Sequence, residues 1–217
     1  MKTHPADSLK HRDPQATREA LLDAAFHEMY RSGFRAASLD AILAATGVTK
    51  GALYHHFRNK RGLGYAVVDE RVRPLVHERY IEPFKSVEDP TEGLKRMGLR
   101  MEKELLKTGI LLLGCPVNNL VQEMSGVDEG FRRRLAAILQ EWKDTIAAGL
   151  RRGQASGLVR TDVDAEALAT FIVASYQGAT GFAKNAHDIR PFTACRESLN
   201  AHLETLRPNS ATQVTAS

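Results

Sequence analysis

The sequence contains few cysteines and no long hydrophobic run. Only two of its 217 residues are cysteines, Cys115 and Cys195, and no CxxC pair is present. We therefore expect neither a disulfide framework nor a metal site. No window approaches the roughly 18 consecutive apolar residues of a membrane span, and the first residues lack the apolar core of a signal peptide. These absences lead us to expect a cytoplasmic protein.

The sequence also lacks the common signatures of an enzyme. No glycine-rich phosphate loop follows a predicted strand. No Glu-x-x-His pair suggests a di-iron bundle, and the eight histidines show no ligand spacing with carboxylates. We expect no catalytic residue and no cofactor, and an enzyme built on a helical bundle stands only as an alternative.

The apolar residues follow the 3.6-residue period of a helix along nearly every long segment, and none shows a sustained period of two. Hydrophobic residues make up 43% of the chain, which is enough for a packed core. We predict an all-α protein with about nine helices, at residues 15–32, 39–46, 50–57, 60–84, 91–106, 116–124, 128–156, 164–185 and 191–206. Pro74 and Pro83 lie inside the fourth of these and predict a kink or break there.

The excess positive charge lies in the amino-terminal part of the chain. Residues 1–62 hold 10 Lys and Arg against 6 Asp and Glu, and the remaining residues hold 20 of each kind. A polyanion such as DNA would be attracted by this distribution, although a basic segment is as often an ordinary solvated face.

The most informative segment is SLDAILAATGVTKGALYHHFRNKRGL, residues 38–63. It predicts two short helices joined by a tight turn, in which Gly47 takes a positive φ at low cost. Ser38 and Thr49 are suited to cap the two helices. On the second helix Leu53 and Phe57 face a small core, because they fall on one side of a helical wheel. The side away from that core carries Lys50, Gly51, Tyr54 and His55.

This outward side has the chemistry of a surface that meets the major groove of DNA. Thr49 brings a hydroxyl and exposed amide groups to a phosphate, and Gly51 permits close approach of the backbone. Lys60 and Ser38 are placed to reach further phosphates. A solvated face of a helical bundle explains any one of these residues equally well, but the combination favours DNA.

The run GVTKGALYHHFRNKRGL closely resembles the signature of the TetR family of repressors, and the upstream SGFRAASLDAILAATGV is similar to the rest of that family's DNA-binding domain. The resemblance covers about residues 17–63. It implies a helix-turn-helix domain at 14–62 and a ligand-sensing and dimerisation domain at 63–207, between tails at 1–13 and 208–217 that we expect to be disordered. The DNA contacts it implies are Ser38, Thr49, Lys50, Gly51, Tyr54, His55 and Lys60.

The resemblance also implies a homodimer whose interface is formed by the last two helices. A stripe of apolar and small residues in both helices suits such an interface, with the core of a monomer as the alternative. The residues that we assign to the interface are Phe171, Ser175, Gly178, Phe182, Leu199 and Leu203.

Residues 90–157 are expected to form the ligand-binding layer. A cavity is expected near Trp142 and the helix at 116–124, although a single Trp at helical spacing is more often a packing residue. Asn118 either orients a polar ligand or caps its helix.

The motif GCPVNNLVQEM, residues 114–124, places Cys115 beside the start of a helix that begins with Pro116. Amide groups and the helix dipole at that end favour a thiolate, and so a thiol of low pKa. The segment also resembles the N-ethylmaleimide-responsive, electrophile-sensing branch of the TetR family. Two interpretations follow, a reactive sensor or a buried small hydrophobe.

The sequence therefore predicts a repressor that binds a palindromic operator and is released by a small-molecule effector or by modification of Cys115. The released dimer is expected to hold its recognition helices too far apart for the operator. A transcriptional activator of the same fold is one alternative. A helical adaptor that binds other proteins is another, but it leaves the coincidence of charge, glycine turn and polar helix face unexplained.

Overall fold

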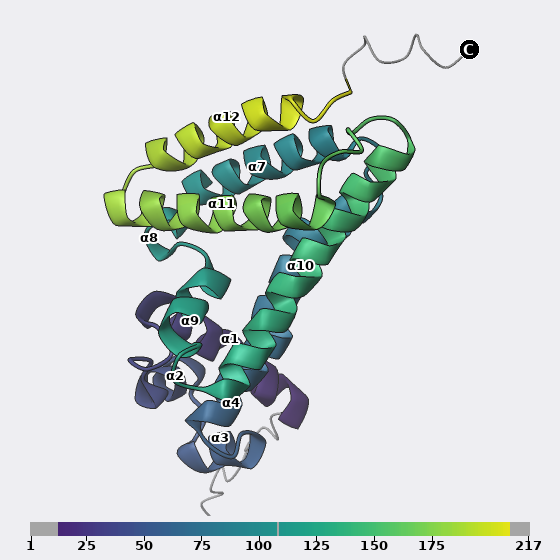
Figure 1. Cartoon of the computed structure of the whole chain (residues 1–217). Helices are drawn as coiled ribbons and strands as arrows, with labels where there is room; N and C mark the ends of the chain where they lie inside the picture. The colour runs from purple at the N-terminus through teal and green to yellow at the C-terminus, as the bar shows by residue number, and fades with distance from the viewer. Residues whose placement is uncertain (1–12, 108, 209–217) are drawn as a thin grey trace, which may run out of the picture. The chain divides into compact units, whose positions relative to one another are not determined.

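The structure is a computed structural model that describes residues 13–107 and 109–208. Every regular element among these residues is helical and none is a strand, which confirms the all-α prediction (Figure 1). No helix in this part of the chain is long and apolar enough to cross a membrane. The chain divides into two compact units, Met1–Val67 and Val68–Ser217. The tails predicted to be disordered lie outside the described residues, apart from Asp13 and Pro208 at their edges.

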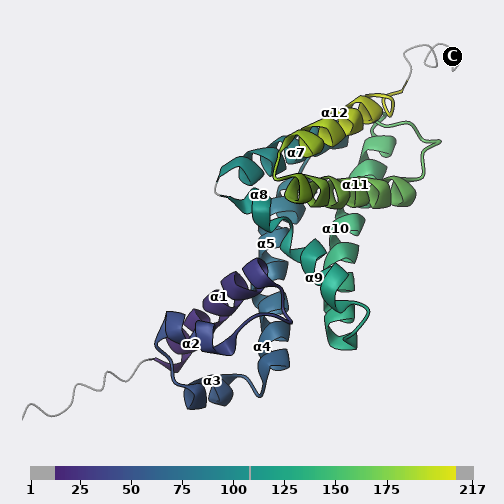
Figure 2. The same cartoon turned by 90° about the vertical axis from the view of Figure 1, so that its left-hand side faces the viewer.

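The first unit consists of four helices (Figure 2). They are α1 (Pro14–Ser32), α2 (Leu39–Thr46), α3 (Lys50–His56) and α4 (Lys60–Val67). Helix α1 packs against the other three. The fully or nearly fully buried side chains of this unit include Leu21, Leu22, Ala25, Ile42, Leu53, Phe57, Leu63 and Val67. Because the last two of these belong to α4, the unit continues to Val67.

The turn between α2 and α3 has the predicted geometry. Gly47 takes a left-handed conformation with φ of 63° and ends α2. The hydroxyl of Ser38 accepts a hydrogen bond from the amide of Ala41 at 3.2 Å, and that of Thr49 accepts one from the amide of Ala52 at 3.2 Å. The local sequence therefore sets both the start of each helix and the angle between them.

The long helix predicted at 60–84 is interrupted by two π-helical segments. After α4 come η1 (Val68–Val72), α5 (Arg73–Val76), η2 (His77–Ile81) and α6 (Glu82–Lys85). A proline, Pro74 or Pro83, stands near the start of the α-helical segment that follows each π-helical one. Proline has no amide hydrogen and its ring clashes with the carbonyl four residues earlier. The backbone adopts the wider turn of a π-helix at this point. The amide of Glu82, for example, donates to the carbonyl of His77, which is five residues back. The disturbance predicted at the prolines takes this form.

The second unit continues with six helices. They are α7 (Pro90–Lys107), α8 (Ile110–Leu113), α9 (Pro116–Met124), α10 (Glu129–Ala155), α11 (Ala165–Ala186) and α12 (Arg190–Glu204). Within this unit α7, α11 and α12 lie side by side, and α10 runs obliquely from them (Figure 1). Helix α8 was not predicted, because four residues are too few to show a period. The largest fully buried side chains are Trp142, Tyr176, Phe84, Phe131 and Phe192.

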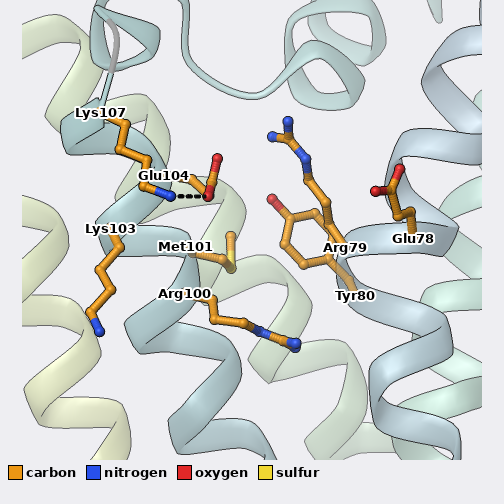
Figure 3. Close-up of a pocket in the computed structure, with 8 residues that line it drawn as sticks. All are labelled: Glu78, Arg79, Tyr80, Arg100, Met101, Lys103, Glu104 and Lys107. Atoms are coloured by element: carbon orange, nitrogen blue, oxygen red, sulfur yellow. Dashed lines mark hydrogen bonds and ion pairs between the residues drawn. The ribbon is translucent and has the colours of Figure 1, made fainter.

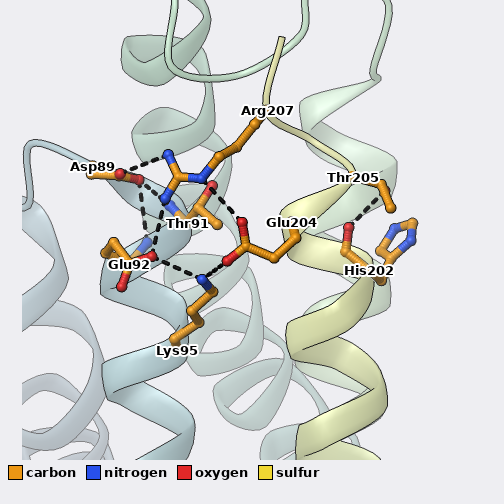
Figure 4. A network of polar contacts seen from close by, with 8 residues as sticks. All are labelled: Asp89, Thr91, Glu92, Lys95, His202, Glu204, Thr205 and Arg207. Atoms are coloured by element: carbon orange, nitrogen blue, oxygen red, sulfur yellow. Dashed lines mark hydrogen bonds and ion pairs between the residues drawn. The ribbon is translucent and has the colours of Figure 1, made fainter. Parts of the chain in front are cut away.

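A network of ion pairs joins the end of α12 to the start of α7 (Figure 4). Asp89 caps α7 by accepting a hydrogen bond from the amide of Thr91 at 2.9 Å. Arg207 donates to Asp89 and to Glu92, each at 3.0 Å. Arg207, just beyond the end of α12, therefore supports the cap of α7, a helix that begins more than a hundred residues earlier in the chain.

Candidate functional site

The outward side of α3 carries the four residues that the sequence assigned to it. Lys50, Gly51 and His55 are exposed, and 42% of the surface of Tyr54 is accessible. Leu53, on the opposite side of the same helix, is completely buried. The helix therefore presents a cation, a phenol and an imidazole on a rigid support, which is the arrangement that direct reading of base edges requires.

Gly51 lies in the middle of α3 without a conformational reason to be glycine. Its φ is not positive, and a Cβ built on it would meet nothing within 4 Å. Glycine inside a helix costs about 1 kcal/mol relative to alanine. Packing within the described chain therefore does not account for this glycine.

Three polar side chains around α3 keep hydrogen-bond donors available. The hydroxyls of Ser38 and Thr49 are acceptors in their helix caps, which leaves each hydroxyl proton available as a donor. Lys60 donates from Nζ to the carbonyl of Arg35 at 2.9 Å, and its ammonium lies 5.2 Å from the centre of the Phe34 ring. Its ammonium is thus held next to the helix-turn-helix, with hydrogens left for a further acceptor.

In the second unit, Trp142 is enclosed and stacked on another aromatic residue. It is 1% exposed, and its ring lies 4.7 Å from that of Tyr80 with only 11° between the planes. Its indole Nε1 is buried without a hydrogen-bond partner in the described part of the chain. Tyr80 was not predicted as a site residue, because nothing in the local sequence reveals a partner so far away in the chain.

Asn118, the other polar residue assigned to sensing, does not cap α9. Its Nδ2 donates to the carbonyl of Gln177 on α11 at 3.5 Å. The side-chain amide of Gln177 is buried beside the thiol of Cys115 and interacts with it. An unpaired buried polar atom such as Nε1 of Trp142 is uncommon in proteins and calls for a water or a ligand. No group of three His, Cys, Asp or Glu residues in the described ranges is arranged to hold a metal ion.

Comparison with known proteins identifies both units. Residues 21–67 match the bacterial regulatory proteins of the tetR family, and residues 101–199 match the tetracyclin repressor-like C-terminal domain. The transcriptional regulator AcuR of Cereibacter sphaeroides is 31% identical over 170 residues, which cover 77% of this chain and 76% of AcuR. This chain belongs to the TetR family of transcriptional regulators.

Solved structures agree with that assignment. A TetR transcriptional regulator from Chloroflexus aurantiacus is 28% identical, with a TM-score of 0.80 over 89% of this chain and 96% of that one. The reduced form of E. coli NemR has a TM-score of 0.74 at 23% identity, over 88% of this chain and 98% of NemR. At that identity the likeness to NemR shows the shared fold and does not extend to its chemistry.

In this TetR-family chain the pKa of the Cys115 thiol is not low, as the sequence led us to expect, but raised. Cys115 stands at the start of α9 without a capping hydrogen bond from its side chain. Burial raises the pKa of the Cys115 thiol, and the nearby amides of Asn118 and Val117 offset this only in part. Cys115 is half-buried. Because desolvation outweighs the helix terminus, the structure favours the interpretation of Cys115 as a buried small residue over that of a readily formed thiolate.

The predicted dimer interface of this TetR-family chain divides into two groups. Phe171 and Phe182 on α11 are 50% and 72% exposed, and Gly178 between them has open space where a Cβ would be. Ser175, on the same side, is half-buried and donates to the carbonyl of Phe171 at 2.8 Å. These four residues form an apolar and small surface on α11, which we call the α11 face.

The two leucines of the prediction lie elsewhere. Leu199 is 3% exposed and Leu203 is completely buried within the chain itself. Their assignment to the interface is corrected: they belong to the core between α12 and its neighbours, and have no surface left for a partner.

Proposed function

We propose that this chain represses transcription by binding a near-palindromic operator in double-stranded DNA as a homodimer. One observation carries the proposal, the exposed side of α3 with its open backbone at Gly51. In a symmetric dimer each α3 enters the major groove of one half-site, and the half-sites lie about one helical turn, roughly 34 Å, apart. The two subunits meet through their α11 faces.

The residues around α3 divide into those that position the protein and those that read sequence. Thr49, Ser38 and Lys60 contact phosphates, which fixes the register of the helix on the duplex. Lys50 donates to acceptors on guanine, and Tyr54 and His55 reach neighbouring base edges or phosphates. The positive charge of the amino-terminal segment adds an attraction that does not depend on sequence.

A small-molecule effector in the second unit releases the operator by stabilising a dimer whose α3 helices no longer match the half-site spacing. The unpaired Trp142 Nε1 supports a ligand in this unit, because a polar ligand would pair it. Release by modification of Cys115, as the resemblance of its segment to electrophile-sensing relatives suggests, is the second candidate trigger. It is weakened by the raised pKa of the thiol.

The proposal is tested by fluorescence anisotropy with the DNA that lies upstream of the protein's own gene. We expect saturable binding of two chains per site, at least about 1,000-fold tighter than binding to scrambled DNA of equal length. Equal affinity for both duplexes would contradict the proposal and favour a protein-binding adaptor. A promoter-reporter assay then distinguishes repression from activation by the sign of the change in transcription.

A further inference from the structure

A groove of about 490 Å³ runs between η2 and α7 in the second unit (Figure 3). This is the size of a site for a small organic molecule. One wall comes from η2 and consists of Glu78, Arg79 and Tyr80; the other comes from α7 and consists of Arg100, Met101, Lys103, Glu104 and Lys107.

Four cations and two carboxylates line the groove, and three of the cations form no ion pair or hydrogen bond with the part of the chain that the structure describes. Glu104 pairs with Lys107 at 3.3 Å. Within the described ranges of the chain, no ion pair or hydrogen bond is formed by the side chains of Arg79, Arg100 or Lys103. Figure 3 shows the guanidinium groups of Arg79 and Arg100 on opposite sides of the Tyr80 ring, so each offers its planar fork of donors to an acidic group at its own end of the groove.

The groove also has a flat aromatic wall. Tyr80 lines it, and the ring of Tyr80 is backed by the buried ring of Trp142 at 4.7 Å. A ring held in this way keeps its orientation, so that a second planar group gains from stacking without ordering the tyrosine first. Met101, on the opposite wall, supplies a polarisable contact to an aromatic edge.

The wall that carries Arg79 and Tyr80 is the π-helical segment η2. Pro83 causes this local structure, since it lacks the amide that would bond to the carbonyl of residue 79. π-helical turns inside α-helices are frequent at functional sites. Here the wide turn sets the directions of two consecutive side chains, one cationic and one aromatic, that form the same wall.

We propose that this groove binds an aromatic carboxylate, with its ring against Tyr80 and its carboxylate attracted by the unpaired cations Arg79 and Arg100. The inference rests on the proposed function, because it names the chemical class of the effector. It does not depend on DNA for its test, since binding to the groove is measured on the protein alone.

The test uses the intrinsic fluorescence of Trp142, the one tryptophan of the chain, which lies directly behind Tyr80. Benzoate is titrated against the full chain, together with neutral benzamide, aliphatic cyclohexanecarboxylate and inorganic phosphate, and isothermal calorimetry provides the independent readout. We expect benzoate to bind about 10-fold more tightly than neutral benzamide, since one charge-assisted hydrogen bond is worth about that factor, and more tightly than phosphate, which has no ring to stack. Cyclohexanecarboxylate keeps the carboxylate and lacks only the aromatic ring, so we expect it to bind roughly 2-fold to 10-fold more weakly than benzoate. Equal binding of benzoate and benzamide, or of benzoate and phosphate, would overturn the inference.

Substitutions then assign the contacts. Arg79→Gln and Arg100→Gln should each weaken benzoate binding by about 10-fold or more, and Arg79→Lys should weaken it less. Tyr80→Leu should reduce the preference for benzoate over cyclohexanecarboxylate while leaving the aliphatic acid unchanged. Arg133→Gln, at an exposed cation of α10, is the matched control. Folding of each variant is verified by its melting curve. If folded Arg79→Gln and Arg100→Gln bind benzoate like the wild type, the groove is not the site.

The two proposals fail in different ways. Operator affinity measured with and without benzoate tests only the effector role. If benzoate binding depends on Arg79 but the protein does not bind operator DNA, the groove assignment is supported and the proposed function is contradicted. If the protein binds the operator but does not bind benzoate in the groove, the proposed function is supported and the groove assignment is contradicted.

Discussion

Arg207 donates a hydrogen bond to Asp89 at 3.0 Å, and Asp89 caps the first turn of α7 (Figure 4). Burial raises the pKa of Asp89, but the amide of Glu92 and the guanidinium of Arg207 outweigh it and hold the pKa below its ordinary value. The folded pKa is therefore lower than the unfolded one. The stability from this group is present above about pH 4 and is lost as the pH falls through the folded pKa.

We expect Asp89→Asn to lower the free energy of unfolding by about 1 kcal/mol near neutral pH, because the cap and the ion pair are weakened. The difference in the free energy of unfolding between Asp89→Asn and wild type should be smaller below the folded pKa of Asp89 than near neutral pH. Urea unfolding at one acidic and one neutral pH measures it. Asp144→Asn, at an exposed residue in the middle of α10, is the control and should change little. A constant difference at both pH values would show that the carboxylate charge of Asp89 plays no part.

Substitution of Lys50 or Tyr54 by Ala should weaken operator binding by about 5-fold to 150-fold, the range for loss of one base contact. Both side chains are exposed, so the melting temperature should stay within error of wild type. Anisotropy titration with the operator measures the effect, and Arg133→Ala controls for loss of one positive charge. Wild-type affinity in both variants would mean that the recognition surface is misassigned.

Gly51→Ala separates the stability of α3 from its function. A Cβ at this position meets nothing, so alanine should stabilise the helix by up to about 1 kcal/mol. Operator affinity should nevertheless fall, because the added methyl stands between the backbone and the DNA. Gly149→Ala is the contrasting variant: its Cβ would lie 2.5 Å from Cε1 of Phe84, and we expect it to destabilise by about 1 to 3 kcal/mol. A more stable Gly51→Ala protein with undiminished affinity would argue against close backbone approach.

Under the proposed α11 interface, Phe182→Asp should dissociate the dimer, because it places a charge in an apolar contact. The measurement is sedimentation equilibrium over a range of concentrations. Val127→Asp alters an equally exposed apolar residue, 64% accessible, away from the α11 face and should leave the dimer intact. Leu199→Ala should instead lower the stability of the protomer by about 2 to 5 kcal/mol, as expected for a buried leucine. Dimerisation unaffected by Phe182→Asp would place the interface elsewhere.

Cys115 should react slowly with N-ethylmaleimide at neutral pH. Burial raises the pKa of its thiol, so little thiolate is present and the rate should increase with pH. Mass spectrometry follows the alkylation in the folded chain and in the chain unfolded by urea, which serves as the reference. Rapid alkylation in the folded state, accompanied by loss of operator binding, would restore the interpretation of Cys115 as an electrophile sensor.

The first unit could be predicted closely because its determinants are local. Caps at Ser38 and Thr49 and the positive φ of Gly47 act over three or four residues, and the polar side of α3 follows from helical periodicity. The same holds for the position of the disturbance at Pro74 and Pro83. The family could be recognised for the same reason, since its signature lies in one continuous run.

The site residues of the second unit could not be predicted as closely, because their surroundings depend on which segments pack together. A leucine stripe on α12 has the same appearance whether it faces its own core or a second chain, and only packing showed that Leu199 and Leu203 are enclosed. The sequence places Cys115 at a helix terminus, but the pKa of its thiol is governed by the desolvation that neighbouring helices impose. The groove joins Arg79 and Tyr80 to Arg100 and, behind them, Trp142. The sequence by itself determined most of the helices, their caps and the polar side of α3, because backbone chemistry acts over a few residues. Burial and the meeting of distant side chains were decided only by the tertiary structure, because both depend on the segments that surround each residue.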